Sequence, residues 1–210
     1  MKNFIWIGGA VIILVLLMFW GVKGSVDIEP SFEAGILHPL DNVKGNVESK
    51  VVVMEYSDFQ CPACRTYYSV TKELIAEFED RVTFVYRHFP LTNIHFNAEL
   101  AARVAEAAGK QDKFWEMHDL LFEKQDEWSR ATDIESVFGS YATLLGLSVP
   151  QFQTDLKSKE VKNFVKAQKT HSIKIGLRGT PTFFVNGEEI QNPTSVKAFK
   201  SIIREALKEQ

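Results

Sequence analysis

The order of hydrophobic and polar positions between residues 51 and 87 predicts a strand, a helix and a second strand. Residues 51–56 are apolar and β-branched apart from a glutamate and a tyrosine, which predicts a buried strand. Residues 66–78 place apolar side chains at helical spacing, and residues 81–87 again have strand character. This order within about 37 residues predicts a parallel βαβ unit with a right-handed crossover.

The pattern then changes to an almost continuous helical block between residues 97 and 175. Alanines form one apolar stripe and larger side chains form two others, with glycine and proline residues between them. The stripes are Ala98, Ala101, Ala102, Ala105 and Ala108; Phe114, Met117 and Leu121; and Ile134, Val137, Phe138, Tyr141, Leu144 and Leu145. Stripes of this kind are typical of a core rather than of a cofactor site, and we expect a helical insertion at about residues 92–176.

The end of the chain returns to strand character. Residues 182–185 predict a strand, Asn186-Gly187 is a strong signal for a two-residue hairpin turn, and residues 188–190 begin the partner strand. Residues 196–207 then predict an amphipathic helix. The chain therefore predicts an α/β fold, in which a βαβ unit and a ββα unit share a small mixed sheet and the helical insertion separates them.

The first part of the chain has a different composition. Residues 4–22 contain no charge, and as a helix they would span about 28 Å, close to the roughly 30 Å hydrocarbon layer of a membrane. We therefore expect one N-terminal transmembrane helix, with residues 1–23 as a membrane anchor. Residues 24–46 mix Gly, Pro, Ser, Asp and Glu without a periodic apolar pattern, which predicts a linker. Residues 47–210 are the predicted folded domain.

Composition and charge limit the class of partner. The chain has 210 residues and 45% of them are hydrophobic, enough for one globular domain with its own core. Its formal net charge is −3, and without the two lysines of residues 1–23 the remainder carries −5. No basic surface is predicted, so we expect no nucleic acid partner.

The candidate chemistry lies in Cys61-Pro62-Ala63-Cys64, which holds the only two cysteines of the chain. The motif stands between a predicted strand and a predicted helix, so Cys61 lies at a helix N-terminus, where Pro62 suits the first turn. Free backbone N–H groups and the helix dipole favour an anion there, and we expect the pKa of the Cys61 thiol to lie well below ~8.5. Cys64, three residues on, is placed to close a disulfide with Cys61.

Two other interpretations of the cysteine pair were weighed. A zinc site needs about four ligands, and the five histidines of the chain are scattered without pair spacing. A purely structural disulfide across four residues would constrain little of the unfolded chain, so its entropic benefit is small. A redox-active disulfide is therefore favoured, and no metal and no cofactor is expected.

Taken together, the motifs resemble those of the DsbA family of thiol:disulfide oxidoreductases. The resemblance covers about residues 46–208 and implies a thioredoxin fold with a helical insertion. It is carried by Cys61-Pro62-Ala63-Cys64 after a strand, by Gly179-Thr180-Pro181-Thr182 before a late strand, and by the helical block between them. Asp58-Phe59-Gln60, Phe89-Pro90-Leu91 and Lys113-Phe114-Trp115-Glu116-Met117-His118 are similar to stretches of membrane-anchored, DsbA-like members.

The resemblance implies a substrate-binding loop. Pro181 is expected to be cis, a minority state on physical grounds alone, and its loop is expected to pack against the disulfide. Thr180 would offer its backbone N–H and C=O to an extended substrate peptide, next to Pro62 and Ala63. An ordinary Thr-Pro turn is the alternative.

The resemblance also singles out Glu55, six residues before Cys61, where the family often has a buried acid. If Glu55 is buried, its raised pKa allows it to relay the proton of Cys64 during exchange. An exposed glutamate on the strand is the alternative.

One position departs from the best-known oxidases of the family, which have histidine where this chain has Ala63. A histidine there donates to the thiolate and stabilises the reduced form, so its absence predicts a less oxidising disulfide. The potentials of this fold span about 150 mV, roughly 7 kcal/mol for two electrons, and the sequence leaves the value open. A reductase or isomerase with the same motif therefore stays an alternative, as does a tethered peptide-binding or chaperone module.

We expect an extracytoplasmic oxidoreductase that introduces disulfides into exported proteins. Such a disulfide is useful outside the reducing cytosol, so the catalytic domain is expected beyond a single-pass cell-membrane anchor whose N-terminus is cytoplasmic. Lysines on both sides of residues 4–22 do not decide the orientation, and cleavage is disfavoured because the apolar run is long for a signal peptide. The expected partners are folding exported proteins with free cysteines and, by resemblance, a reoxidising membrane protein that is DsbB-like or similar to vitamin-K-epoxide reductase (VKOR-like).

Overall fold

The computed structural model describes residues 32–210, so the predicted anchor lies outside the described residues. Within residues 32–210, no helix combines the length and the apolar character that crossing a membrane requires. The strands are β1 (Asn42–Gly45), β2 (Val52–Ser57), β3 (Thr83–His88), β4 (Thr182–Val185) and β5 (Glu188–Ile190). The helices are α2 (Pro62–Phe78), α3 (Ala98–Gly109), α4 (Phe114–Glu123), α5 (Gln125–Trp128), α6 (Ile134–Leu144), α7 (Val149–Lys157), α8 (Lys159–Lys174) and α9 (Val196–Ala206).

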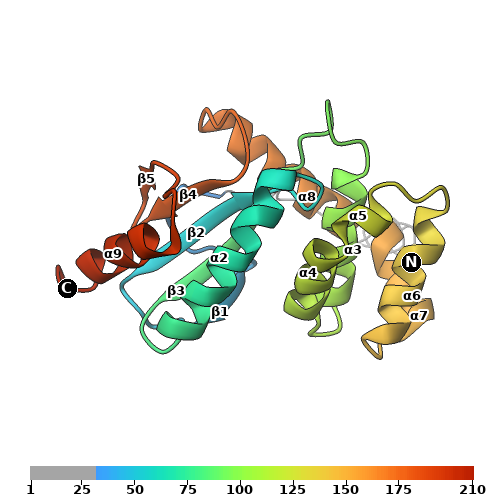
Figure 1. Cartoon of the computed structure of the whole chain (residues 1–210). Coiled ribbons are helices and arrows are strands. Elements are labelled where there is room, and N and C mark those ends of the chain that lie inside the picture. The colour runs from blue at the N-terminus through green and yellow to red at the C-terminus, as the bar shows by residue number, and fades with distance from the viewer. Residues whose placement is uncertain (1–31) are drawn as a thin grey trace, which may run out of the picture.

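The described strands form one mixed sheet in the order β1-β3-β2-β4-β5 (Figure 1). β2 and β3 run parallel with α2 between them along the chain, which confirms the predicted βαβ unit. β4 and β5 form the predicted hairpin, and Asn186 and Gly187 at its turn have φ values of 51° and 87°, the left-handed conformation that such turns require. β1 and β5 are the edge strands, and β5 begins with the exposed glutamates Glu188 and Glu189.

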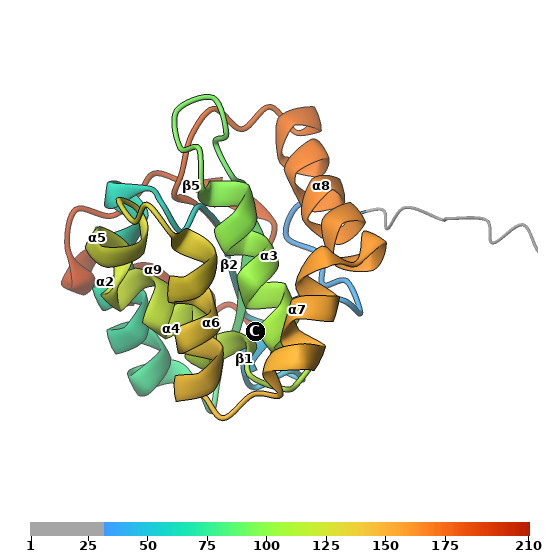
Figure 2. The same cartoon turned by 90° about the vertical axis from the view of Figure 1, so that its right-hand side faces the viewer.

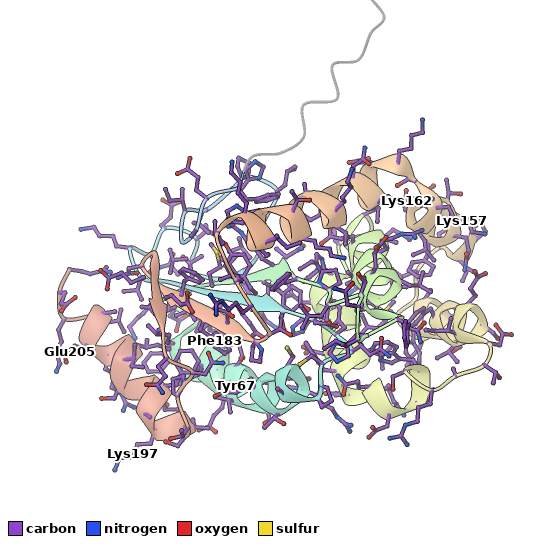
Figure 3. The ribbon with its side chains drawn as sticks, turned by 90° about the horizontal axis from the view of Figure 1, so that it is seen from above. Tyr67, Lys157, Lys162, Phe183, Lys197 and Glu205 are labelled. Atoms are coloured by element: carbon purple, nitrogen blue, oxygen red, sulfur yellow. The ribbon has the colours of Figure 1, made fainter. Side chains whose placement is uncertain are left out.

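One face of the sheet is covered by α2 and α9, which lie side by side (Figures 1 and 3). Phe183 of β4 lies between aromatic rings of the two helices, 5.4 Å from the Tyr67 ring and 5.0 Å from the Phe199 ring. Figure 3 shows Tyr67 and Phe183 directed toward each other across the interface between helix and sheet. This packing holds α2, and therefore its N-terminal end, in a fixed position over β2.

Helices α3 to α8 form a block at one end of the sheet, as Figures 1 and 2 show. The predicted alanine stripe on α3 is completely buried, and the stripe on α4 is buried as well. On α6 the prediction is wrong for Leu144, which is 70% exposed because it lies on the outer side of the last helical turn. Phe59 and Tyr86 share the core of this block, so the helical insertion packs directly on the segment before the cysteines.

The predicted linker is wrong over its second half, because residues 32–46 belong to the fold. Residues 42–45 form β1 and pair antiparallel with β3, and Phe32 is buried. The strand has only four residues and none of them is fully buried, so it leaves no apolar period in the sequence. It forms because tertiary contacts hold it, and the folded domain therefore begins before residue 47.

The strongest of these contacts is the completely buried ion pair between Arg87 of β3 and Asp41. The guanidinium group donates to both Asp41 carboxylate oxygens, at 2.9 and 2.8 Å. It also donates to the backbone carbonyls of Glu33 and Ile36 and to the Tyr56 hydroxyl, so all of its N–H groups are hydrogen-bonded. Arg87 thus fastens residues 32–41 to the sheet.

Candidate active site

The two cysteines lie at the N-terminal end of α2, where the sequence places them. Cys61 is the N-cap residue with an extended backbone (φ −73°, ψ 122°), and α2 begins at Pro62, which confirms the predicted place of Pro62 in the first turn. The Cys61 N–H donates to the Asp58 carbonyl at 3.0 Å, which ends the turn after β2. Cys64 is completely buried and Cys61 is 7% exposed, so only Cys61 offers its sulfur to a substrate.

The surroundings of Cys61 stabilise its thiolate. The hydrogen bond from the Cys64 thiol makes the largest contribution, and together with Thr180 and the backbone N–H groups of Cys64 and Ala63 it outweighs burial and lowers the pKa of Cys61 to about 5. No acidic residue lies in the first turn of α2 to oppose the negative charge. At neutral pH, Cys61 is therefore the nucleophile of the pair.

The surroundings of Cys64 have the opposite effect and favour its protonated thiol. Burial raises the pKa of Cys64 well above its ordinary value, and the neighbouring charges of Cys61 and Glu55 raise it further. The reduced site thus holds one thiolate and one proton, with the proton on Cys64.

A pH titration of the reduced full-length chain tests this asymmetry. The ultraviolet absorbance of the Cys61 thiolate is expected to rise with an inflection near pH 5, and Cys61→Ser should abolish that inflection. The folded reduced protein binds fewer protons than the unfolded chain between the lowered and the ordinary pKa of Cys61, so its stability should rise with pH across that window. An inflection near ~8.5 would contradict the assignment.

The loop before β4 completes the site. The Thr180–Pro181 peptide bond is cis, which confirms the prediction. In its thiol form, Cys61 donates to the Thr180 carbonyl at 3.4 Å. The Asn192 side chain donates to the Pro181 carbonyl at 2.7 Å and holds the loop in place. Residues about 120 positions apart in the sequence therefore meet at the sulfur, and the substrate-binding role of Thr180 stays a prediction.

Glu55 of β2 is buried, 6% exposed, so the alternative of an exposed glutamate is wrong. The Thr71 hydroxyl donates to one carboxylate oxygen, Oε2, at 3.3 Å, and the other, Oε1, has no partner among the described residues. Burial is the main reason why the pKa of Glu55 rises to about 7, and the Cys61 charge adds to it. Its role as a proton relay stays a prediction, with a pKa matched to neutral pH.

Asp58 shapes the turn before Cys61, a role that sequence reasoning did not assign. Its buried carboxylate accepts from the N–H of Gln60 at 2.7 Å and of Leu91 at 2.9 Å, and it pairs with the His95 ring at 2.7 Å. Aspartate favours such turns, so the sequence contains a local signal for the turn at Asp58. It contains no signal that Leu91 and His95, in the loop after β3, would bind the carboxylate.

Gln125 of α5 ties the helical block to the cysteine motif. Its buried side-chain amide donates to the carbonyls of Phe59 at 2.7 Å and Cys61 at 3.0 Å. No sequence signal pointed to this residue, since its partners lie more than 60 positions away. The helical insertion therefore supports the N-terminal end of α2 directly.

An exposed apolar loop stands next to the motif. Asn97 donates its N–H to the Gln60 side chain at 2.8 Å, and Lys169 of α8 donates to Thr92 at 2.6 Å, so both ends of the loop between β3 and α3 are fixed. Ile94 is 65% and Phe96 is 85% exposed on it. Figure 2 shows this loop in green, standing out beside the end of α8. It gives the rim of the site an apolar surface.

Other hollows lie away from the sulfurs. A hollow of about 650 Å³ lies between the start of β1 and helices α3, α4 and α8, and neither cysteine lines it. Among residues 32–210, no group of three or more His, Cys, Asp or Glu side chains is arranged to hold a metal ion.

A family comparison decides the class of the protein. The Thioredoxin_4 family model, described as thioredoxin, matches residues 38–205. The chain belongs to this family. Three features of the structure are consistent with this family: the order of the strands, the cysteines at the start of α2 and the cis-proline loop before β4.

Solved structures with the same fold include an oxidoreductase and DsbA proteins, which confirms the resemblance to the DsbA family. A thioredoxin-like oxidoreductase from Silicibacter pomeroyi is 27% identical with a TM-score of 0.69, covering 81% of this chain and 94% of that one. BdbD from Bacillus subtilis is 25% identical with a TM-score of 0.71, covering 80% and 93%. Wolbachia pipientis α-DsbA1, at 20% identity and a TM-score of 0.73 over 83% and 94%, supports the fold. The chain is thus a thioredoxin-family protein whose structure is similar to those of DsbA-like oxidoreductases.

The curated relatives are much longer proteins. The chain is 37% identical over 167 residues to the Na(+)/H(+) antiporter NhaA 3 of Salinispora tropica, and 35% identical over 192 residues to NhaA 1 of Mycolicibacterium vanbaalenii. The matches cover 80% and 86% of this chain but only 25% and 30% of those antiporters. The similarity therefore concerns one part of each antiporter.

Proposed function

We propose that the protein introduces disulfides into exported proteins by dithiol–disulfide exchange through Cys61 and Cys64. The observation that carries this direction is the stabilised Cys61 thiolate, with its pKa lowered to about 5. A thiolate that is stabilised in the reduced protein makes the corresponding disulfide easier to reduce, and therefore a stronger oxidant. Ala63 contributes its backbone N–H to this stabilisation although it lacks the side chain that histidine has in the best-known oxidases.

The exchange follows from the asymmetry of the two sulfurs. A substrate thiolate attacks Cys61 in the disulfide form, the Cys61–Cys64 bond breaks, and the electron pair goes to Cys64, which takes up a proton. Glu55, with its pKa near 7, is the proposed source of that proton. A second substrate thiolate then attacks the mixed disulfide, and Cys61 leaves as a stable thiolate. During these steps, Thr180 holds the substrate backbone next to the sulfur, beside Pro62 and Ala63.

The proposed setting is the outer face of a cell membrane. Residues 1–23 would anchor the chain with a cytoplasmic N-terminus, as the uncharged segment 4–22 supports. The antiporter relatives are named for ion transport across a membrane, and they include a stretch similar to this chain, which also favours a membrane setting. The proposed partners are folding exported proteins with free cysteines and a DsbB-like or VKOR-like membrane protein that reoxidises Cys61 and Cys64.

The equilibrium reduction potential of the cysteine pair tests the direction. The full-length chain is equilibrated with defined ratios of reduced and oxidised glutathione, and the oxidised fraction is counted by alkylation and mass spectrometry. A potential well above about −200 mV is expected for a protein that donates disulfides. A value near about −270 mV would overturn the oxidase proposal and favour a reductase with the same site.

A further inference from the structure

Ser57, the last residue of β2, lies in the site without a partner. Side chains alternate along a strand, so Ser57 and Glu55 point to the same face of the sheet. Ser57 is 1% exposed, and its hydroxyl oxygen makes no hydrogen bond of ordinary geometry among the described residues. The Glu55 oxygen Oε1 and the hydroxyl of Tyr86, which stands opposite Glu55 in β3, are unpartnered as well. Three buried oxygens without partners thus gather on neighbouring positions of β2 and β3.

A buried hydroxyl without a partner costs stability, and an alanine at position 57 would avoid that cost. Groups of this kind are expected where function requires them. The Ser57 hydroxyl is near enough to Cys64, Glu55 and Tyr86 to lower the pKa of each. No hydrogen bond of ordinary geometry among the described residues joins the Cys64 sulfur to Glu55, and none joins Ser57 to either group. Glu55 acts on Cys64 through its charge, whereas the Ser57 hydroxyl influences both groups.

We propose that the Ser57 hydroxyl carries the proton between the Cys64 sulfur and the Glu55 carboxyl. This role rests on the proposed disulfide exchange and adds Ser57 to the groups that transfer its proton. When Cys64 leaves the disulfide with its electron pair, it takes the hydroxyl proton of Ser57, and the Ser57 oxygen takes the proton of the Glu55 carboxylic acid. Glu55 remains as a carboxylate, and no charge is left on Ser57. When Cys64 attacks a mixed disulfide on Cys61, the same two protons move in the opposite direction.

Other ionisable groups face the same space and define the pH range of a test. Tyr86 stays neutral, because burial raises its pKa well above the ordinary value, and His118 of α4 stays neutral above pH 6.5, because burial lowers its pKa. Other groups whose charges act on Glu55, Cys64, Tyr86 or His118 are Cys61, Asp58, Asp119, Lys44 and His88, and His88 stands opposite Ser57 in β3. A kinetic inflection near pH 7 is therefore assigned to Glu55 by its loss in Glu55→Gln.

The test follows the reduction of the oxidised full-length chain by glutathione, a step in which Cys64 is the leaving group. Its rate constant, divided by the thiolate fraction of glutathione, is measured by stopped-flow fluorescence from about pH 6 to pH 9. In the unmodified protein it should fall as Glu55 loses its proton near pH 7. Ser57→Ala is expected to lower the rate below pH 7 by at least about tenfold and to remove the inflection.

Ser172→Ala is the matched control, because Ser172 is equally buried but donates to the Gln168 carbonyl at 2.9 Å, within α8. It should keep the inflection and lower the melting temperature, whereas Ser57→Ala should leave the melting temperature unchanged or raise it. If Ser57→Ala keeps the inflection, Glu55 acts on Cys64 without Ser57 and the relay is overturned. If Glu55→Gln keeps it, the failure lies in the proposed role of Glu55 itself.

Discussion

Replacing Cys64 with serine is expected to stop turnover and to leave substrate proteins joined to Cys61 through a mixed disulfide. Cys61 keeps its place at the start of α2 and its contact with Thr180, so it still exchanges with substrates. The serine hydroxyl does not attack a disulfide, because thiol–disulfide exchange requires a thiolate. Non-reducing electrophoresis of the full-length Cys64→Ser protein, produced in cells that export it, should show adducts that dithiothreitol removes.

Cys61→Ser is the control for this trapping experiment. It retains Cys64, which is completely buried and keeps its proton because its pKa is raised well above the ordinary value. Few adducts are expected from it. If Cys64→Ser yields no more dithiothreitol-sensitive adducts than Cys61→Ser, the assignment of Cys61 as the exchanging sulfur is wrong.

Asp41→Ala is expected to lower the free energy of unfolding by about 3–5 kcal/mol. The substitution leaves the Arg87 guanidinium completely buried and removes the carboxylate that receives two of its hydrogen bonds. An unpaired buried charge is far more costly than a lost surface contact. The change should appear in denaturant unfolding curves as a lower midpoint, and residues 32–41 should become accessible to proteolysis.

Asp126→Ala offers a comparison with the same change of side chain. Asp126 forms an ion pair with Arg65 near the cysteines, but its side chain is 64% exposed. Solvent screens such a pair, so its loss should lower the free energy of unfolding far less than the loss of Asp41 does. Equal effects of the two substitutions would show that Arg87 does not depend on Asp41.

The features that the sequence predicted well have local causes. The hairpin at Asn186 and Gly187 depends on residues that tolerate positive φ, and the helix that starts after Cys61 depends on Pro62 and on the apolar spacing that follows. The cis bond before Pro181 followed from the family resemblance rather than from physics, and the structure agrees. Such signals lie within a few residues of the feature they predict.

The features that the sequence did not reveal depend on distant partners. β1 exists because it pairs with β3 and because Arg87 holds Asp41 beside it, about 45 positions away. Gln125 supports Cys61 across a similar separation. The sequence could not decide whether Glu55 is buried, because it is a polar residue in an apolar strand. Its burial depends on another part of the chain that covers the strand.

The edge strands have a consequence for a protein that meets unfolded polypeptides. A free sheet edge invites a passing chain to add itself as another strand, which would be the first step of co-aggregation. β5 has only three residues and presents Glu188 and Glu189, while β1 has four residues, including a lysine and a terminal glycine. Short edges with charged side chains discourage such addition. Under the proposed function, these edges would keep the protein out of aggregates of its unfolded substrates. The proposed strand-like contact at Thr180 would then be left for the substrate segment that carries the cysteine.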